Sequence, residues 1–154
     1  MTRVLVRASV ALAAFSAVAL TVAPVASAAP TPSIITSVRI GHHATFDRLV
    51  FTFRGPVPTH DVRYVSAVYA DASGRTVALL GAAKLRVVLH PTSTTTRAPQ
   101  GTWTPRYPEI RQVKGAGDFE GVTSYGVGLT KREPLHVFTL RSPNRLVVDV
   151  QLPH

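Results

Sequence analysis

Apolar and polar side chains alternate along most of the chain after its first thirty or so residues. Near position 50, for example, Leu49, Phe51 and Phe53 share one side of an extended chain, with polar or smaller residues between them. A period of two, combined with many β-branched residues, is typical of β-strands. Because a sustained helical period with capping residues is missing from the sequence, the pattern predicts an all-β protein.

Segments with this alternation are separated by turn-forming Gly, Pro, Asn, Asp and Ser residues. We expect strands at Ile35–Ile40, Leu49–Arg54, Val62–Ala70, Thr76–Leu80, Lys84–His90, Ile110–Val113, Val122–Leu129, Leu135–Arg141 and Arg145–Leu152. The last two are joined by Ser142–Asn144 and give the clearest hairpin. Strands with one apolar face are expected where two antiparallel sheets pack together, so the predicted fold is a small antiparallel β-sandwich.

The N-terminal segment has the layout of a secretory signal peptide. Arg3 and Arg7 precede an apolar run, Ala8–Val22, and the small residues Ala26–Ala28 follow. This order predicts cleavage after the last of these alanines. The apolar run is shorter than the ~20 residues that a membrane-spanning helix needs.

These boundaries predict a simple organisation for an exported chain. We expect a signal peptide over residues 1–28, a Pro-containing linker over 29–37 and one β-sandwich domain over 38–152. The expected location is extracellular and associated with the cell envelope, with no membrane span after signal cleavage.

Charge and cysteine content narrow the possible partners. The chain has a formal net charge of +9 and no cysteine, so disulfides, thiolate metal sites and thiol nucleophiles are excluded. A basic exported domain attracts anionic polymers, although the charge also serves solubility. Nucleic acid is a poor partner for an exported chain; a cell-wall glycan, an anionic polymer or another secreted protein fits better.

The segment Pro91–Pro108 is long for a loop in a compact domain, and is expected to be either functional or disordered. Aromatic faces stack on sugar rings, and guanidinium groups bind carboxylates or phosphates. The candidate ligand-binding residues in and beside this segment are Trp103, Arg106, Tyr107 and Arg111, with Arg63 and Tyr64 offering the same chemistry elsewhere. Alternatively, the Trp and Tyr side chains pin the loop to the sandwich.

Signals for nucleophilic or metal chemistry are weak. A Gly-x-Ser-x-Gly motif is absent, and a Ser–His–Asp triad could arise only through tertiary contacts. His42 and His43 with Asp47, or His60 with Asp61, carry metal-ligating groups. Adjacent histidines on a strand point to opposite faces, so we interpret them as polar turn residues and expect no metal and no cofactor.

One pair of carboxylates lies close together in a glycine-rich segment. Asp118 and Glu120 are two positions apart in Gly115–Gly121, and an extended chain would place them on one face, as in an inverting glycosidase. The alternative, which we favour, is that Phe119 fills the core and the carboxylates accept structural hydrogen bonds. We therefore expect no catalytic residues.

Three blocks resemble a known family: Ile40–Pro56, Gly117–Leu129 and Phe138–Val150. They are similar to the AMIN-like domain of secreted and lipid-anchored proteins of high-GC Gram-positive bacteria, which is related to the AMIN domain of cell-wall amidases. The resemblance covers about residues 38–152. The opening block Phe46–Arg48 and the closing block Pro143–Val150 are specific when taken together. Asp47-Arg48 and Arg145…Asp149 within them resemble signature positions of the family, and we read them as charges on the mixed face that pair across strands.

The resemblance implies a β-sandwich that localises proteins to the envelope by binding peptidoglycan. It implies no active site, since hydrolysis in the amidases belongs to a separate zinc domain. The leading hypothesis is a non-catalytic envelope-binding module. The alternatives are a protein-interaction module of a secreted complex and a small glycan hydrolase that uses Asp118 and Glu120.

Overall fold

The computed structural model describes residues 29–153, and the predicted signal peptide lies outside this range. The described chain is all-β, with antiparallel strand pairing and no helix long and apolar enough to cross a membrane. Its strands are β1 (Ile34–His42), β2 (Phe46–Arg54), β3 (Thr59–Val65), β4 (Ala83–His90), β5 (Thr102–Trp103), β6 (Ile110–Phe119), β7 (Val122–Leu129), β8 (Leu135–Leu140) and β9 (Asn144–Gln151). The predicted fold class is confirmed.

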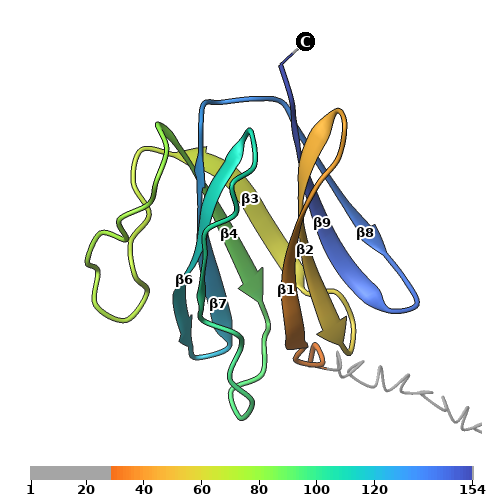
Figure 1. The fold of residues 1–154 in the computed structure, drawn as a ribbon. Coiled ribbons are helices and arrows are strands. Elements are labelled where there is room, and N and C mark those ends of the chain that lie inside the picture. Colours follow the sequence, from red (N-terminus) through yellow and green to blue (C-terminus); the bar gives the residue numbers. More distant parts are fainter. Residues whose placement is uncertain (1–28, 154) are drawn as a thin grey trace, which may run out of the picture.

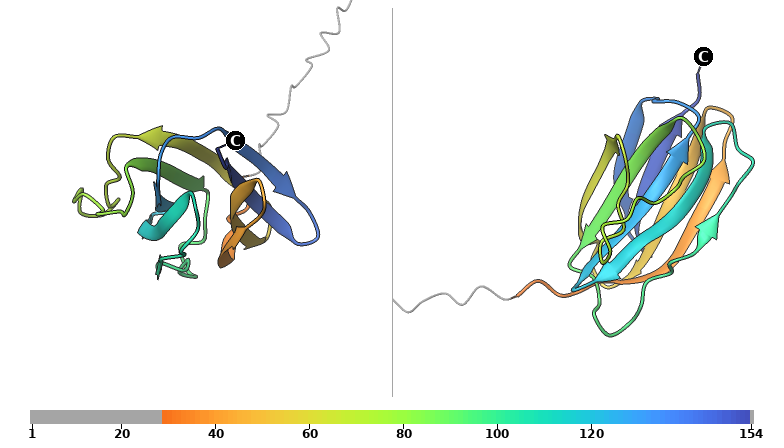
Figure 2. Two further views of the ribbon diagram at one scale, coloured as in Figure 1. Left: turned by 45° about the horizontal axis from the view of Figure 1, so that its top comes forward. Right: turned by 90° about the vertical axis from the view of Figure 1, so that its left-hand side faces the viewer.

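The strands form two sheets that pack as a sandwich (Figures 1 and 2). One sheet has four strands in the order β1-β2-β9-β8, and the other has five in the order β3-β4-β7-β6-β5. The predicted hairpin is present as β8–β9, with Leu140 opposite Arg145. Each sheet turns one face inward and leaves the other for loops, solvent or ligands.

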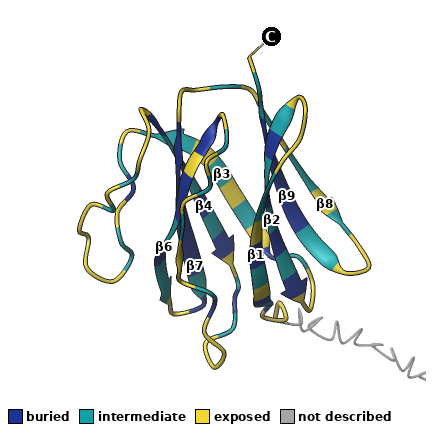
Figure 3. Cartoon of the chain, viewed as in Figure 1, coloured by how far each residue is buried: buried dark blue, intermediate teal, exposed yellow. Residues whose placement is uncertain are grey.

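The core lies between the inward faces of the two sheets (Figure 3). Leu49, Phe51 and Phe53 of β2 are buried against β4 and β7 residues such as Leu85 and Val127. Burying a large apolar side chain contributes roughly 1.5–3 kcal/mol, so these positions dominate the stability of a domain without disulfides.

The segment between β3 and β4 differs from its prediction. The expected strand Thr76–Leu80 does not form, and only an isolated bridge joins Tyr69 to Thr76. Residues 66–82 instead fold over the outer face of β6 and β7, at the left of Figure 1. The glycines of β7 make room: a Cβ at Gly126 would lie 2.9 Å from Leu79 Cδ1. The apolar residues that predicted a strand here therefore belong to a loop that packs on the sheet.

The glycine-rich segment 115–121 is also different from its prediction. Most of it extends β6, which runs to Phe119, and a two-residue turn then leads into β7. Glu120 and Gly121 in that turn have φ of 49° and 77°, the left-handed values of a type I′ hairpin. Phe119 was expected to fill the core; at this hairpin tip it is 54% exposed.

The start of the domain precedes the expected boundary. β1 begins at Ile34, inside the segment 29–37 that was expected to be a linker. Ser33 is fully buried, receives a hydrogen bond from Ser93 N at 2.8 Å and donates its own backbone N–H to Pro91 O at 3.1 Å. These bonds fasten the first strand to the loop that follows β4.

Candidate functional site

The candidate residue Trp103 lies in β5 and packs inward. Its ring is 6.5 Å from the ring of Tyr125, centroid to centroid, and it contacts the core while remaining partly exposed. Tyr125 is buried and donates a hydrogen bond to Pro99 O at 2.7 Å. Burial raises the pKa of Tyr125, so its hydroxyl stays protonated as a donor. This packing orders the segment Pro91–Pro108 against the five-stranded sheet.

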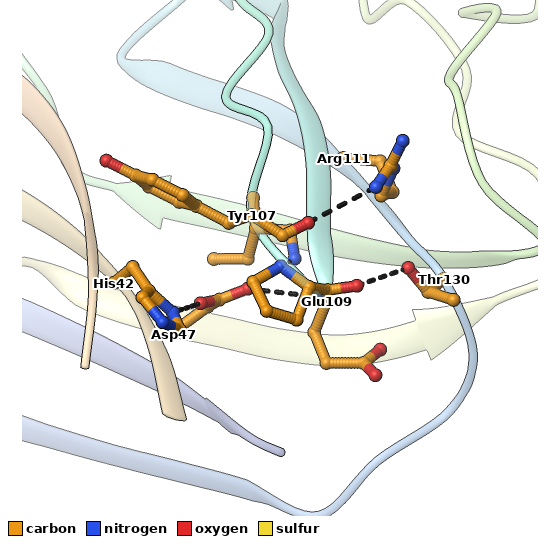
Figure 4. Close-up of polar contacts among 8 residues, drawn as sticks. His42, Asp47, Tyr107, Glu109, Arg111 and Thr130 are labelled. Atoms are coloured by element: carbon orange, nitrogen blue, oxygen red, sulfur yellow. Dashed lines mark hydrogen bonds and ion pairs between the residues drawn. The ribbon is translucent and has the colours of Figure 1, made fainter. Parts of the chain in front are cut away.

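Tyr107 and Arg111 lie where this loop meets β6 (Figure 4), and Arg106 precedes Tyr107 in the loop. The ring of Tyr107 is 5.7 Å from that of His42, and Arg111 donates a 3.3 Å hydrogen bond to Tyr107 O. Arg106 is exposed, and within residues 29–153 its side chain makes no hydrogen bond or ion pair. The structure thus brings Tyr107 and Arg111 together, while Trp103 faces the core.

Asp47 is buried beneath this region and joins the two sheets. Its Oδ2 accepts hydrogen bonds from the backbone N–H groups of Glu109 (2.7 Å) and Ile110 (2.9 Å), and its Oδ1 lies 2.7 Å from His42 Nδ1. The sequence placed Asp47 on the mixed face of its strand, but its side chain is fully buried on the inward side. Its oxygens are thus committed to structure, and no group of three or more potential metal ligands forms within the described chain.

Glu109 is a buried carboxyl beside this network. It is 2% exposed, and its Oε2 has no hydrogen-bond partner. Burial and the nearby charges of Glu133 and Asp47 raise the pKa of Glu109, while Lys131 partly opposes them. The group is therefore easier to protonate than an exposed glutamate.

The carboxylates of Asp118 and Glu120 do not form a catalytic pair in this geometry. Asp118 Oδ2 accepts a hydrogen bond from Ala98 N, and its Oδ1 accepts one from Thr123 Oγ1, both at 2.8 Å. Glu120 is exposed at the tip of the β6–β7 turn. Asp118 therefore holds the Pro91–Pro108 loop against the hairpin, which is the structural role expected for it.

A different surface gathers charge and aromatic rings on the outer face of the four-stranded sheet. Arg48 of β2 donates two hydrogen bonds to Asp149 of β9, at 2.7 and 2.8 Å. These bonds raise the pKa of Arg48 and fix its guanidinium group in place. The Cζ atom of Arg48 lies 4.7 Å from the ring centre of Phe46 and 5.6 Å from that of Phe138.

Histidines extend this arrangement at both ends. His43 stacks on Phe46 with ring centres 4.4 Å apart, and His136 lies 4.8 Å from Phe138. We call the row of five side chains the cationic–aromatic ladder: His43, Phe46, Arg48, Phe138 and His136. Each ring contacts its neighbour, so the side chains support one another's positions.

A groove of about 460 Å³ lies on the same face. Arg39 and Arg145 contribute cations to its lining, and Ser37 and Thr52 contribute hydroxyls. Asp149, the carboxylate of this face, is 3% exposed and paired with Arg48. The face is therefore basic and rich in hydrogen-bond donors.

Comparison with known proteins identifies the family. The sequence model of the AMIN-like domain family matches residues 33–152. The chain belongs to the AMIN-like domain family. No curated protein and no solved structure matches it. Membership indicates a binding module related to the cell wall, as the resemblance implied.

The signature residues of this AMIN-like domain have distinct roles. Arg48 and Asp149 pair across strands as the sequence indicated, whereas Asp47 anchors β6 from inside the core. The ladder was missed because its aromatic members come from separate strands. Phe46 and Arg48 are two positions apart on one strand, and this spacing indicated that they share a face. The pairing of β8 with β9 brings Phe138 and His136 to the same face.

Proposed function

We propose that this AMIN-like domain is a non-catalytic module of an exported protein that binds the glycan of the cell wall, peptidoglycan, through the cationic–aromatic ladder. The observation that carries the proposal is the Arg48–Asp149 pair, which holds a guanidinium group between two partly exposed phenyl rings. Aromatic faces stack on sugar rings, and a fixed guanidinium group binds carboxylates. Peptidoglycan presents both kinds of group.

Four further features support this proposal. The predicted signal peptide directs the chain to the envelope, and the 15 Lys and Arg residues that follow it outnumber the 8 Asp and Glu residues, which favours an anionic wall. Both oxygens of Asp118 are engaged in structural hydrogen bonds, which argues against hydrolysis by Asp118 and Glu120. The basic groove beside the ladder lengthens the surface available to a glycan strand.

Sedimentation with purified sacculi tests the proposal. The double variant Phe46→Ala/Phe138→Ala should pellet about tenfold less well than the parent, since stacking on an aromatic ring contributes roughly 0.5–1.5 kcal/mol and about 1.4 kcal/mol corresponds to tenfold in affinity. Phe119→Ala is the matched control, because it removes an exposed phenyl ring from the β6–β7 tip. Parent protein that stays in the supernatant at low salt would overturn the proposal.

Recognition of another secreted protein is a second candidate function. β8 is an edge strand of the four-stranded sheet, and its sequence Leu-His-Val-Phe-Thr-Leu carries no Asp, Glu, Lys or Arg. An open strand edge accepts an added strand through backbone hydrogen bonds. Co-purification of one partner in the absence of wall material favours this function, and failure to recover any partner argues against it.

A further inference from the structure

A second basic surface lies on the other sheet, away from the ladder. Residues 66–82 cover β6 and β7 on the outer face of the five-stranded sheet and leave β3 and β4 open (Figure 1). A groove of about 600 Å³ runs between this loop and the two open strands. Arg63 of β3 and Arg86 of β4 both line it.

These two arginines are direct register partners on neighbouring strands. Like charges opposite each other destabilise a sheet, and the carboxylates nearby compensate only partly. Arg63 Nε lies 3.3 Å from Asp61 Oδ2 in a pair that is about half exposed, and Arg86 lies 3.6 Å from Asp71 Oδ1, beyond hydrogen-bond distance. Each guanidinium group has five N–H donors, so most of them remain available to a ligand.

The basic lining continues into an adjoining groove of about 310 Å³, which shares Val65 and Ser66 with the first. Lys84, Lys131 and Arg132 line this second groove. We call the two grooves together the cationic track: Arg63, Arg86, Lys84, Lys131 and Arg132. Three carboxylates lie beside these five cations: Asp61 near Arg63, Asp71 near Arg86, and Glu133, which pairs with Lys131 at 2.7 Å.

The loop of residues 66–82, which forms one side of the track, is held in place by the sheet. Tyr69 stands 55% exposed at its rim, yet its neighbour Val68 is fully buried. The backbone on either side is tied down by hydrogen bonds from Val77 N to Val68 O (2.8 Å) and from Asp71 N to Ala116 O (2.9 Å). The loop therefore presents an aromatic ring beside the arginines at little further entropic cost.

We propose that the cationic track binds a linear polymer that carries oxyanions at regular intervals, phosphodiesters or carboxylates. A row of cations along two connected grooves matches a repeated charge better than a single small anion. Guanidinium forks bind the oxygens of either group through paired N–H donors, and Tyr69 offers a ring to the uncharged links between them. The site is separate from the ladder and does not depend on the glycan-binding proposal.

Titration calorimetry with purified polymers tests the track without wall material. Polyglycerol phosphate and polygalacturonate supply the two oxyanions, and neutral dextran is the uncharged control. Arg63→Ala/Arg86→Ala removes two cations from the track; Arg54→Ala/Arg97→Ala removes the same charge from exposed positions elsewhere. Thermal unfolding of both variants checks that they are folded.

We expect at least one oxyanion polymer to bind the parent, and dextran not to bind. The track double variant should lose affinity about tenfold or more, and the charge-matched control less than about threefold. The polymer that binds more tightly identifies the oxyanion, phosphodiester or carboxylate, that the track prefers. Equal losses in the two double variants, or binding of neither polymer by the parent, would overturn the track while leaving sacculus binding by the ladder to be judged on its own test.

Discussion

Asp47 shows how one side chain can hold two sheets together. Its carboxylate satisfies two backbone N–H groups at the start of β6, and its strand belongs to the opposite sheet. Asp47→Ala leaves those buried donors without partners, so the free energy of unfolding should fall by about 3 kcal/mol or more. Urea denaturation measures the change, with the half-exposed Asp61→Ala as a control expected to cost under about 1 kcal/mol. Similar losses in both variants would contradict this role.

Glu109 makes stability depend on pH in a predictable direction. Because burial raises the pKa of Glu109, the folded protein keeps its proton over a range in which the unfolded chain has released it. The stability contributed by this group is complete below the unfolded pKa of about 4.3 and is lost as the pH rises through the higher folded pKa.

The free energy of unfolding of Glu109→Gln, measured by urea denaturation at pH 7, should therefore exceed that of the parent by about 1 kcal/mol, because the substitution removes a buried charge with an unpaired oxygen. The advantage should shrink towards pH 4. Glu120→Gln, at an exposed turn, is the matched control and should change little. An advantage of the same size at both pH values would show that ionisation of Glu109 is not its source.

At the scale of elements, the glycines of β7 determine where the loop of residues 66–82 lies. A Cβ at Gly128 would stand 1.9 Å from Leu80 O, so Gly128→Ala must push the loop away from the sheet. We expect a loss of about 1–3 kcal/mol and faster proteolysis within residues 66–82. Gly41→Ala in β1 meets only His43 Nε2 at 3.9 Å and should cost less than about 1 kcal/mol. A stable, protease-resistant Gly128→Ala protein would show that the loop adapts freely.

The loop of residues 66–82 illustrates which strands can be predicted from the sequence and which cannot. Strands whose apolar face meets the core, such as β7 and β9, were predicted to within one residue, because burial on one face forces alternation. β2 was predicted from Leu49, although it begins at Phe46. Thr76–Leu80 was also expected to be a strand, but Leu79 packs on a glycine-lined sheet face and Leu80 is 51% exposed, and an apolar run in the sequence does not distinguish such a loop from a strand. β5 is two residues long and carries no periodicity at all.

Site residues were harder to predict than strands, because they depend on which strands become neighbours. The sequence grouped Tyr107 and Arg111 with Trp103 as candidate ligand-binding residues, and offered as the alternative that the aromatic side chains pin the loop to the sandwich. In the structure Arg111 contacts Tyr107, and Trp103 packs towards Tyr125. The ladder needs β2, β9 and β8 side by side, and the track needs Arg63 opposite Arg86. Such contacts follow from register, which a single chain reveals only in short hairpins.

At the scale of the whole molecule, the two proposed surfaces lie on the outer faces of opposite sheets and differ in how strongly salt should affect them. The side chain of Arg63 is 61% exposed, whereas that of Arg48 is 28% exposed and paired with Asp149. Raising the ionic strength from ~0.1 M to ~1 M shortens the Debye length from about 10 Å to about 3 Å, which screens exposed charges most. Stacking of sugar on the ladder rings is much less sensitive to salt.

The two double variants should therefore give different salt curves in sacculus sedimentation. Phe46→Ala/Phe138→Ala leaves the track as the main attachment, so its residual binding should disappear as the salt concentration rises. Arg63→Ala/Arg86→Ala leaves the ladder, so its binding should be weaker at low salt but nearly constant across the series. If binding by the two variants falls with salt in the same way, one surface carries all the binding. If the two salt dependences differ, the sandwich binds the wall by two different chemistries, one on each sheet.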